Sequence, residues 1–540
     1  MSKSSWYLTG TATAALVLAT VPVPAGAQTS AAPAQIAAPA GTDTAPTEGA
    51  AAQRDTAPRS VVPSAPPRRL PGPSNRPSQT LAAPLSEAYP LEGVGDGVTS
   101  GGYNQSRWVE DWSGLRDPKK RKGGLDRLKF LPLDGDGDVY LTLSGELRQR
   151  FNVTTNPDLR STPHQRQDQT RIVGAADLHV GPHVRVFGEL AHAGLGGRNL
   201  GNPSGFQKND LIVQQSFADV VGEVGAVDLG VRYGRQTFAD GPNLLTVPRD
   251  NNPIFTTFNG VRGWARAAGA RIDLFDFTPT RPGNEGTDDD LNKDTRRFSG
   301  VSTGIVVPRD WFGGSKLFVD PFVWRLRNTA AVWGGRSARE ERHFYGVHVW
   351  GDVGPVNLDW TVNHQGGEYD DREISAWQLL FAQSYRIGKD RTAPRVGFHA
   401  DYATGGGAFG TGKLRTALAP FGNNIYYSYQ LYATPTNLIA VAPNVSFQPV
   451  AKVRAALEYQ LSWRENTRDA IYRANGTALP RTQLFGASRI ANTARAQVIW
   501  TISRYLSFTG RYEHLDAGPA LTDAGLRSSD FFAGWLSFRF

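Results

Sequence analysis

Residues 452–464, KVRAALEYQLSWR, alternate between two kinds of side chain. The odd positions are apolar: Val453, Ala455, Leu457, Tyr459, Leu461 and Trp463. The even positions are charged or polar except for Ala456. A period of two indicates a β-strand, because successive side chains leave opposite faces of the pleat. Sandwich strands also alternate but rarely run past about ten residues, so this longer strand, with aromatic residues toward one end of its apolar face, is typical of an outer-membrane barrel wall.

The same alternation begins at Val139 and recurs to Phe540, with short turns and long polar loops between the strands. Turns on one side and long loops on the other are typical of an up-and-down barrel whose turns face the periplasm. We therefore predict an all-β fold, a transmembrane antiparallel up-and-down β-barrel of about 18 strands over residues 139–540. The facing of the strands at 317–327 and 374–386 stays open. The final segment, DFFAGWLSFRF, ends on an aromatic residue and resembles the terminal signature of outer-membrane barrels.

Composition excludes several other classes of protein. The chain of 540 residues has no cysteine, which excludes disulfides, thiolate zinc sites and cysteine nucleophiles. The mean hydropathy is −0.37, and no stretch after the N-terminus offers the roughly 20 consecutive apolar residues of a membrane helix. The formal net charge is +8, but most basic residues are single arginines at strand spacing, so we expect no nucleic-acid partner.

The N-terminal region predicts export. Lys3, an apolar stretch and the small residues Ala25-Gly26-Ala27 predict a cleaved signal peptide at 1–27. Residues 28–100 are rich in Ala, Pro, Thr and Ser, which predicts a disordered linker. Residues 101–138 contain aromatic residues without a strand period, and we interpret them as an ordered periplasmic arm. Together these features place the barrel in the outer membrane of a Gram-negative bacterium.

Charged residues at strand positions must share the face opposite the apolar one, because an arginine facing lipid near the bilayer midplane costs roughly 2 to 4 kcal/mol. Arg148, Arg454 and Arg511 belong to this inward set, and so do acids such as Glu146 and Glu458. Two interpretations stay open. Arginines and carboxylates can pair across strands and brace the wall, or unpaired arginines can make a water-filled lumen selective for anions.

Several segments resemble the alginate export family of outer-membrane barrels. The opening RWVEDWSGLRDPKKRKGGLDRLKFLPL followed by YLTLSGELRQRF resembles the start of that family's chains. Later segments that resemble it are VRYGRQTF, FNGVRGW, PRVGFHADYATGGG and SWRENTRDAIY. The resemblance covers most of residues 107–540.

The resemblance implies a monomeric barrel with an electropositive pore that exports an anionic, alginate-like polysaccharide. It carries Arg232, Arg235, Arg262, Arg395 and Arg464 over as pore-lining candidates, although Arg235 breaks the parity of Arg232 and would lie at the rim. With the residues chosen by parity, the candidates for pore lining and substrate binding are Arg148, Arg232, Arg235, Arg262, Arg395, Arg454, Arg464 and Arg511. Where the family's exporter has an Arg-Glu pair, this chain has Gln214 and Gln215, so alginate itself stays open as substrate.

Other sites were weighed and set aside. Asp134, Asp136 and Asp138 resemble the start of a calcium loop, but Val139 and Gly145 stand where an EF-hand needs Gly and Glu, so a turn is expected. The nine histidines show no metal-ligand spacing, so no metal and no cofactor are expected. No serine nucleophile accompanies a histidine on the wall, so an enzyme is not expected.

An anion-selective porin for the uptake of small carboxylates is the alternative to export. An adhesin with a blocked lumen, and periplasmic secretion partners for the linker, stay open.

Overall fold

The computed structural model describes residues 103, 106–240, 244–292, 294–390, 392–422 and 425–540. The predicted signal peptide at 1–27 and the predicted linker at 28–100 lie outside the described residues, as do four positions of the arm. Within the described ranges no helix is long and apolar enough to cross a membrane.

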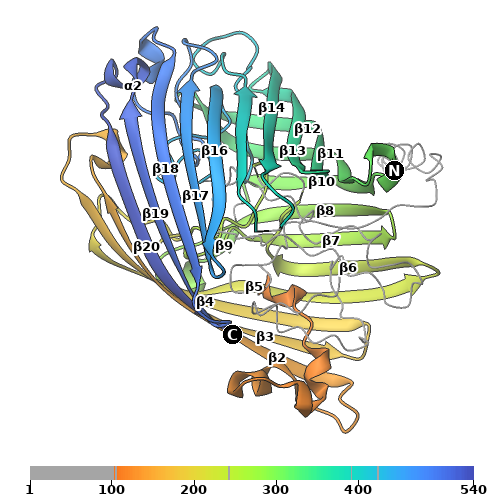
Figure 1. The fold of residues 1–540 in the computed structure, drawn as a ribbon. Coiled ribbons are helices and arrows are strands. Elements are labelled where there is room, and N and C mark those ends of the chain that lie inside the picture. Colours follow the sequence, from red (N-terminus) through yellow and green to blue (C-terminus); the bar gives the residue numbers. More distant parts are fainter. Residues whose placement is uncertain (1–102, 104–105, 241–243, 293, 391, 423–424) are drawn as a thin grey trace, which may run out of the picture.

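The described strands form one antiparallel sheet that closes into a barrel (Figure 1). Long strands that follow one another in the chain pair side by side, and the last strand, β20, returns to pair with β2. The sheet has 20 strands among the described residues, and β1 and β9 contain two residues each. The remaining 18 strands make the wall, which confirms the predicted up-and-down β-barrel.

The wall strands are mostly longer than ten residues, as the length of the alternating segments indicates. In chain order they are β2 (Val139–Thr154), β3 (Gln165–Val180), β4 (Val184–Arg198), β5 (Asn209–Val224), β6 (Val227–Gln236), β7 (Phe258–Ala267), β8 (Ala270–Arg281), β10 (Arg296–Val306), β11 (Lys316–Trp333), β12 (Arg336–Val353), β13 (Val356–Tyr369), β14 (Arg372–Arg386), β15 (Arg395–Ala403), β16 (Leu438–Val450), β17 (Val453–Trp463), β18 (Arg489–Thr501), β19 (Leu506–Ala517) and β20 (Ser529–Arg539). Strand β8 pairs directly with β10, so the short β9 does not interrupt the wall.

The other described elements are short and belong to the arm, the turns and the loops. They are β1 (Leu131–Pro132), β9 (Leu291–Asn292), η3 (Arg107–Val109), η4 (Ser113–Arg116), η5 (Pro118–Lys120), η6 (Gly124–Lys129), η7 (Pro157–Leu159), η8 (Thr287–Asp289), η9 (Arg309–Phe312), η10 (Thr482–Leu484) and the α-helix α2 (Pro519–Thr522).

The two faces of the wall differ as the alternation predicts. On β17 the odd positions Leu457 and Tyr459 are 49% and 47% exposed, whereas Gln460 is buried. On β3 Ile172 is exposed, whereas Arg171 on the opposite face is buried. Aliphatic side chains therefore project outward, and most charged side chains of the strands project into the barrel.

One part of the interior departs from this division. Phe275, Phe298, Phe322, Trp324 and Phe344 project inward from β8, β10, β11 and β12 and are buried together. Alternation alone assigns apolar residues to the outer face, and that assignment is wrong here. The physical reason is that long loops fold over these rings and exclude water from them.

The arm lies at the end of the barrel where the short turns and the C-terminus are found (Figure 1). Its η6 ends at Lys129, whose Nζ donates to Ser144 Oγ on β2 at 2.7 Å. The rings of Phe130 and Tyr140 stack at 4.5 Å between centroids. The arm is therefore docked against the first strand of the wall.

Candidate functional site

Two long loops fold into the barrel and meet each other. One joins β6 to β7 (residues 237–257), and the other joins β15 to β16 (residues 404–437). The Val247 N–H donates to the Phe421 carbonyl at 3.1 Å, and the Phe421 N–H donates to the Leu245 carbonyl at 2.9 Å. The sequence alone does not place these loops, because their contacts join residues more than 170 positions apart.

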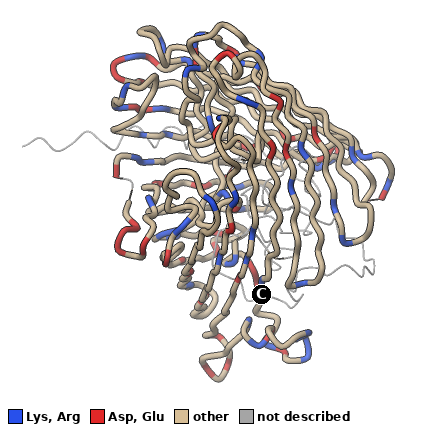
Figure 2. Tube along the Cα trace, turned by 90° about the vertical axis from the view of Figure 1, so that its left-hand side faces the viewer, with Lys and Arg blue, Asp and Glu red and all other residues tan. Residues whose placement is uncertain are grey.

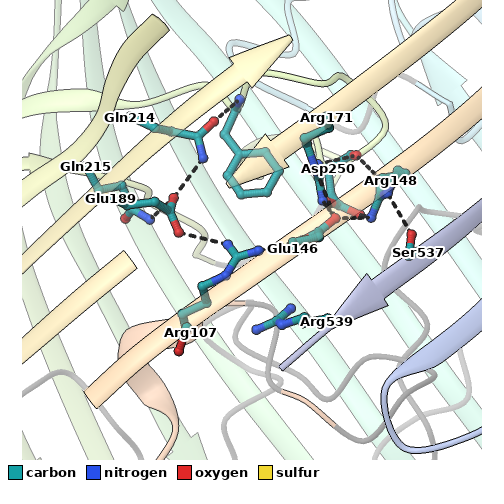
Figure 3. Close-up of polar contacts among 12 residues, drawn as sticks. Arg107, Glu146, Arg148, Arg171, Glu189, Gln214, Gln215, Asp250, Ser537 and Arg539 are labelled. Atoms are coloured by element: carbon teal, nitrogen blue, oxygen red, sulfur yellow. Dashed lines mark hydrogen bonds and ion pairs between the residues drawn. The ribbon is translucent and has the colours of Figure 1, made fainter. Parts of the chain in front are cut away.

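The tip of the first loop inserts a carboxylate between two arginines of the inner wall (Figure 3). Asp250 accepts from Arg148 Nη2 at 3.2 Å and from Arg171 Nη2 at 2.8 Å. Glu146 on β2 also pairs with both arginines, at 3.2 Å from Arg148 Nη2 and 3.0 Å from Arg171 Nε. Planar guanidinium groups bind carboxylates in a forked geometry, so this wall offers a site for a carboxylate, and Asp250 fills it.

Two further arginines lie beside the same loop tip. Arg150 donates to Asn152 Oδ1 at 2.7 Å and to Asn251 Oδ1 at 2.8 Å. Arg511 on β19 donates to Asn251 Oδ1 at 3.0 Å. Both guanidinium groups lie over the ring of Trp535, at 4.8 and 4.9 Å from its centroid. We call Arg148, Arg150, Arg171 and Arg511 the inner arginine cluster.

The arm reaches the same cluster from the opposite end of the barrel. Arg107 bridges Glu146, at 2.5 Å from Nη2, and Glu189, at 2.8 Å from Nη1 (Figure 3). Gln214 and Gln215 donate to Glu189 at 2.7 and 2.9 Å. Gln214 and Gln215 therefore hold the carboxylate that binds the arm. A continuous set of ion pairs runs from the arm through Glu146 to the loop.

The structure divides the eight predicted arginines into four groups of two. Arg148 and Arg511 lie together at the loop tip, as described. Arg232 and Arg262 are buried in the wall, where Arg232 binds Asp219 at 2.7 and 2.8 Å and Arg262 binds Asp273 at 2.9 Å. These two pairs brace neighbouring strands, which is the structural interpretation that the sequence left open. Many other Lys and Arg positions also lie near Asp and Glu in the wall (Figure 2).

Arg395 and Arg454 lie on inward positions far from the loop tip. Arg395 begins β15, is 8% exposed and donates to Ser384 Oγ at 3.3 Å. Arg454 follows the first residue of β17 and is half-buried on the face that it shares with Gln460.

Two predicted pore-lining residues lie elsewhere. Arg235 shares a strand face with Tyr233, which is 73% exposed, and donates to the Val213 carbonyl at 2.8 Å, so it belongs to the outer face of β6. Arg464 is 2% exposed and donates to the Thr482 and Phe485 carbonyls at 2.6 Å each. It organises the loop at 465–488 rather than facing the lumen, because backbone carbonyls take its donors.

The alternation of inward and outward positions could have identified Arg171, which was not among the predicted pore-lining residues. Arg171 occupies an odd position of β3, on the face of buried Gln169 and Asp177. The sequence around Asp250 and Asn251 gives no such indication, since these residues lie in a loop without alternating polar and apolar positions.

The turn expected at Asp134 is present: its carboxylate accepts from the Val139 N–H at 2.9 Å. No group of residues able to hold a metal ion occurs in the described part of the chain.

Comparisons with known proteins agree with this architecture. A family model described as alginate export matches residues 139–534. No curated protein matches the chain significantly. Acinetobacter baumannii OccAB1 is similar in structure, with 11% identity, a TM-score of 0.51, and coverage of 77% of this chain and 99% of that one. This likeness shows the fold of the barrel.

Two further solved structures are similar. Pseudomonas aeruginosa OccK2 (OpdF) in complex with glucuronate has 11% identity and a TM-score of 0.47, covering 76% of this chain and 98% of that one. A BenF-like porin from Pseudomonas fluorescens Pf-5 has 10% identity and a TM-score of 0.49, covering 74% and 99%.

Proposed function

The chain belongs to the alginate export family of outer-membrane channels, and on that premise we propose that it exports an anionic polysaccharide whose carboxylates bind the inner arginine cluster. One observation carries this proposal: the carboxylate of Asp250 is bound by Arg148 and Arg171 inside the barrel. A uronate residue carries the same functional group, so it can form the same charge-assisted hydrogen bonds.

Transport in this proposal proceeds by exchange of carboxylates. A uronate carboxylate takes the place of Asp250, and the loop at 237–257 moves away from the wall. Arg150 and Arg511 on either side offer the next contacts, since Asn251, a neutral partner, binds both. Conduction requires that the solute binds favourably but dissociates easily. Several adjacent arginines can bind the carboxylate, and Asp250 and Asn251 compete for the same arginines and help to release it.

A planar-bilayer measurement tests this function. We expect the purified full chain to carry an anion-selective current that polyuronate oligomers block and neutral oligosaccharides of equal length do not. Arg148→Gln with Arg171→Gln should weaken the block by at least about tenfold, because two charge-assisted contacts of roughly 1.5 to 3 kcal/mol are lost. Block that is unchanged in the double variant would remove the inner arginine cluster from the proposal.

The contact between the two inward loops favours a second candidate function. Backbone hydrogen bonds join Leu245 and Val247 to Phe421 across the interior, and a crossed interior suits small solutes better than a polymer. In that case the chain is an anion-selective porin for small carboxylates. The same measurement separates the two, since a porin would pass small carboxylates and be indifferent to polyuronate oligomers.

A further inference from the structure

Four arginines project from the outer face of the barrel on three adjacent strands. They are Arg297 on β10, Arg325 and Arg327 on β11, and Arg339 on β12, and we call them the outer arginine patch. Their odd numbers place them on the face of exposed Val323 and Tyr345, whereas the even positions Phe322, Trp324 and Phe344 face inward. Strand pairing sets Arg297 opposite Arg327, so the patch is continuous across the wall.

The patch lies at the end of the barrel where the long loop at 282–295 leads into β10 and a two-residue turn joins β11 to β12. Arg297 follows the loop at 282–295, and Arg339 lies three residues into β12. Toward the other end, the same outer face carries Val323, Tyr345 and Val347, which are 50%, 49% and 39% exposed. The outer wall therefore changes from apolar to cationic along single strands. Because the short turns of outer-membrane barrels face the periplasm, the cationic part lies on the outer-leaflet side of the apolar band.

The patch carries more positive charge than its own acids neutralise. Glu341 is shared by Arg325, by Arg327 at 3.3 Å and by Arg339 at 4.0 Å, and it also lies 3.3 Å from His343 Nε2. Arg297 pairs with Asp276, at 2.6 Å from Nε. Glu368 on β13 is paired with Glu341 on β12 and is the third carboxylate near the patch.

The arginines keep donors available to a partner from outside the barrel. The side chains of Arg297, Arg327 and Arg339 are 59%, 46% and 77% exposed. A single carboxylate has about four lone-pair sites, whereas each guanidinium group has five N–H donors, so Glu341 cannot satisfy three arginines. Because the side chains of Arg297, Arg327 and Arg339 are exposed on the outer face, an anionic group of the membrane can reach them.

We propose that the outer arginine patch binds the phosphate groups of an anionic glycolipid in the outer leaflet. Arginine is favoured for this task because its planar fork binds two phosphate oxygens at once. Lysine and arginine are far better tolerated near the membrane interface than at the midplane, so this position can carry the charges. Each basic residue close to an anionic lipid surface strengthens binding by about fivefold. The apolar side chains next to the patch contact the acyl chains of the same lipid.

Native mass spectrometry of the full chain in neutral detergent tests the proposal. The probes are bis-phosphorylated lipid A, the same lipid without phosphates, and inorganic phosphate. We expect the wild-type protein to bind the phosphorylated lipid at least about tenfold more tightly than the dephosphorylated one. Arg325→Gln with Arg327→Gln should remove most of that preference, because each arginine contributes about fivefold, and an unchanged preference in this variant would overturn the proposal.

The control variant removes two charges of the same kind from exposed loop positions outside the patch. Arg160→Gln with Arg527→Gln should leave the preference unchanged, and heat-modified gel mobility verifies that both variants keep a closed barrel. Equal binding of the two lipids by the wild-type protein would overturn the proposal, as would an equal loss in the control. Displacement of the lipid by millimolar inorganic phosphate would show a free-phosphate site and would also overturn it, as would phosphate-independent retention of an acidic protein on the patch.

Discussion

At the scale of single residues, Asp250 governs access to the inner arginine cluster. Arg148 and Arg171 each pair with two carboxylates, Glu146 and Asp250. Asp250→Asn removes one of these negative charges, so the arginines become available to anionic solutes. We expect stronger anion selectivity and block by polyuronate oligomers at a roughly tenfold lower concentration, because a charge-assisted internal contact no longer competes. Reversal potentials in a salt gradient measure the first effect and single-channel block the second. Asp288→Asn, an exposed acid in another loop, is the control and should change neither.

Arg464 leads to a different expectation from the pore-lining role that its sequence position predicts. Its guanidinium group donates to the Thr467, Asp469, Thr482 and Phe485 carbonyls, and burial lowers its pKa. Arg464→Ala leaves these acceptors unsatisfied, and we expect local opening of the loop at 465–488 to become easier by about 3 kcal/mol. Limited proteolysis of that loop measures the effect. Unchanged cleavage together with lower anion selectivity would restore the pore-lining role.

At the scale of elements, the outer face of a strand determines whether the barrel can assemble in a membrane. Leu457 lies in the middle of β17 and is 49% exposed on the outer face. Leu457→Arg should destabilise the inserted barrel by about 2 to 4 kcal/mol. Ala451→Arg, in the adjacent exposed turn, should cost about 0 to 1 kcal/mol because that position lies at the interface. Refolding yields into lipid vesicles compare the two variants, and equal yields would contradict the assigned facing.

The arm contains a buried lysine whose protonation is linked to docking. Burial is the main cause that lowers the pKa of Lys129 to about 7, Arg539 and Arg107 lower it further, and Glu110 and Asp126 partly oppose the shift. Its ammonium lies over the rings of Trp112 and Phe540. The docked arm therefore binds fewer protons than a released arm between about pH 7 and the ordinary lysine pKa near 10.4. Docking should strengthen as pH rises through this window and be weakest at or below about pH 7.

Hydrogen exchange of residues 106–130 measures this pH dependence after correction for the intrinsic exchange rate. We expect protection of the arm, relative to strands β2 and β3, to rise by up to about tenfold per pH unit between roughly pH 7.5 and 9.5. Lys129→Met removes the titrating group and keeps an apolar contact with the rings, so its protection should be flat across the same range. A wild-type profile as flat as that of the variant would contradict the linkage.

Alternation along the strands predicted the wall and its inner charges, and it failed where other segments change the environment. Glu146 and Arg148 face inward on β2 because polar and apolar positions alternate along most of the strand. Phe298 and Phe322 face inward although they are apolar, because the loops at 237–257 and 404–437 cover them. No local pattern encodes such contacts. The partners of Arg464 were not predictable for the same reason, since they are carbonyls of a loop that has no period.

At the scale of the whole molecule, ion pairs connect the two ends of the barrel. Arg107 of the arm binds Glu146, which binds Arg171 of the wall, which in turn binds Asp250 of the loop. The arm approaches from the end with the short turns, and the loop starts from the other end. Glu146 pairs directly with Arg107 of the arm and is connected to Asp250 of the loop through Arg148 and Arg171. When the arm undocks or the loop leaves the wall, the balance of charge around Glu146, Arg148 and Arg171 changes for the segment that stays bound.

A double-mutant cycle with Arg107→Ala and Asp250→Asn tests this connection. Arg107→Ala frees Glu146 to pair more fully with Arg148 and Arg171, so it should weaken the hold of these arginines on Asp250 and raise channel conductance. Because the two replaced residues belong to one network of ion pairs through Glu146, their effects on the open fraction should deviate from additivity by about 0.5 to 3 kcal/mol. Planar-bilayer recordings measure the open fraction of the wild-type protein, the two single variants and the double variant. Additive effects would show that the arm and the loop close the barrel independently.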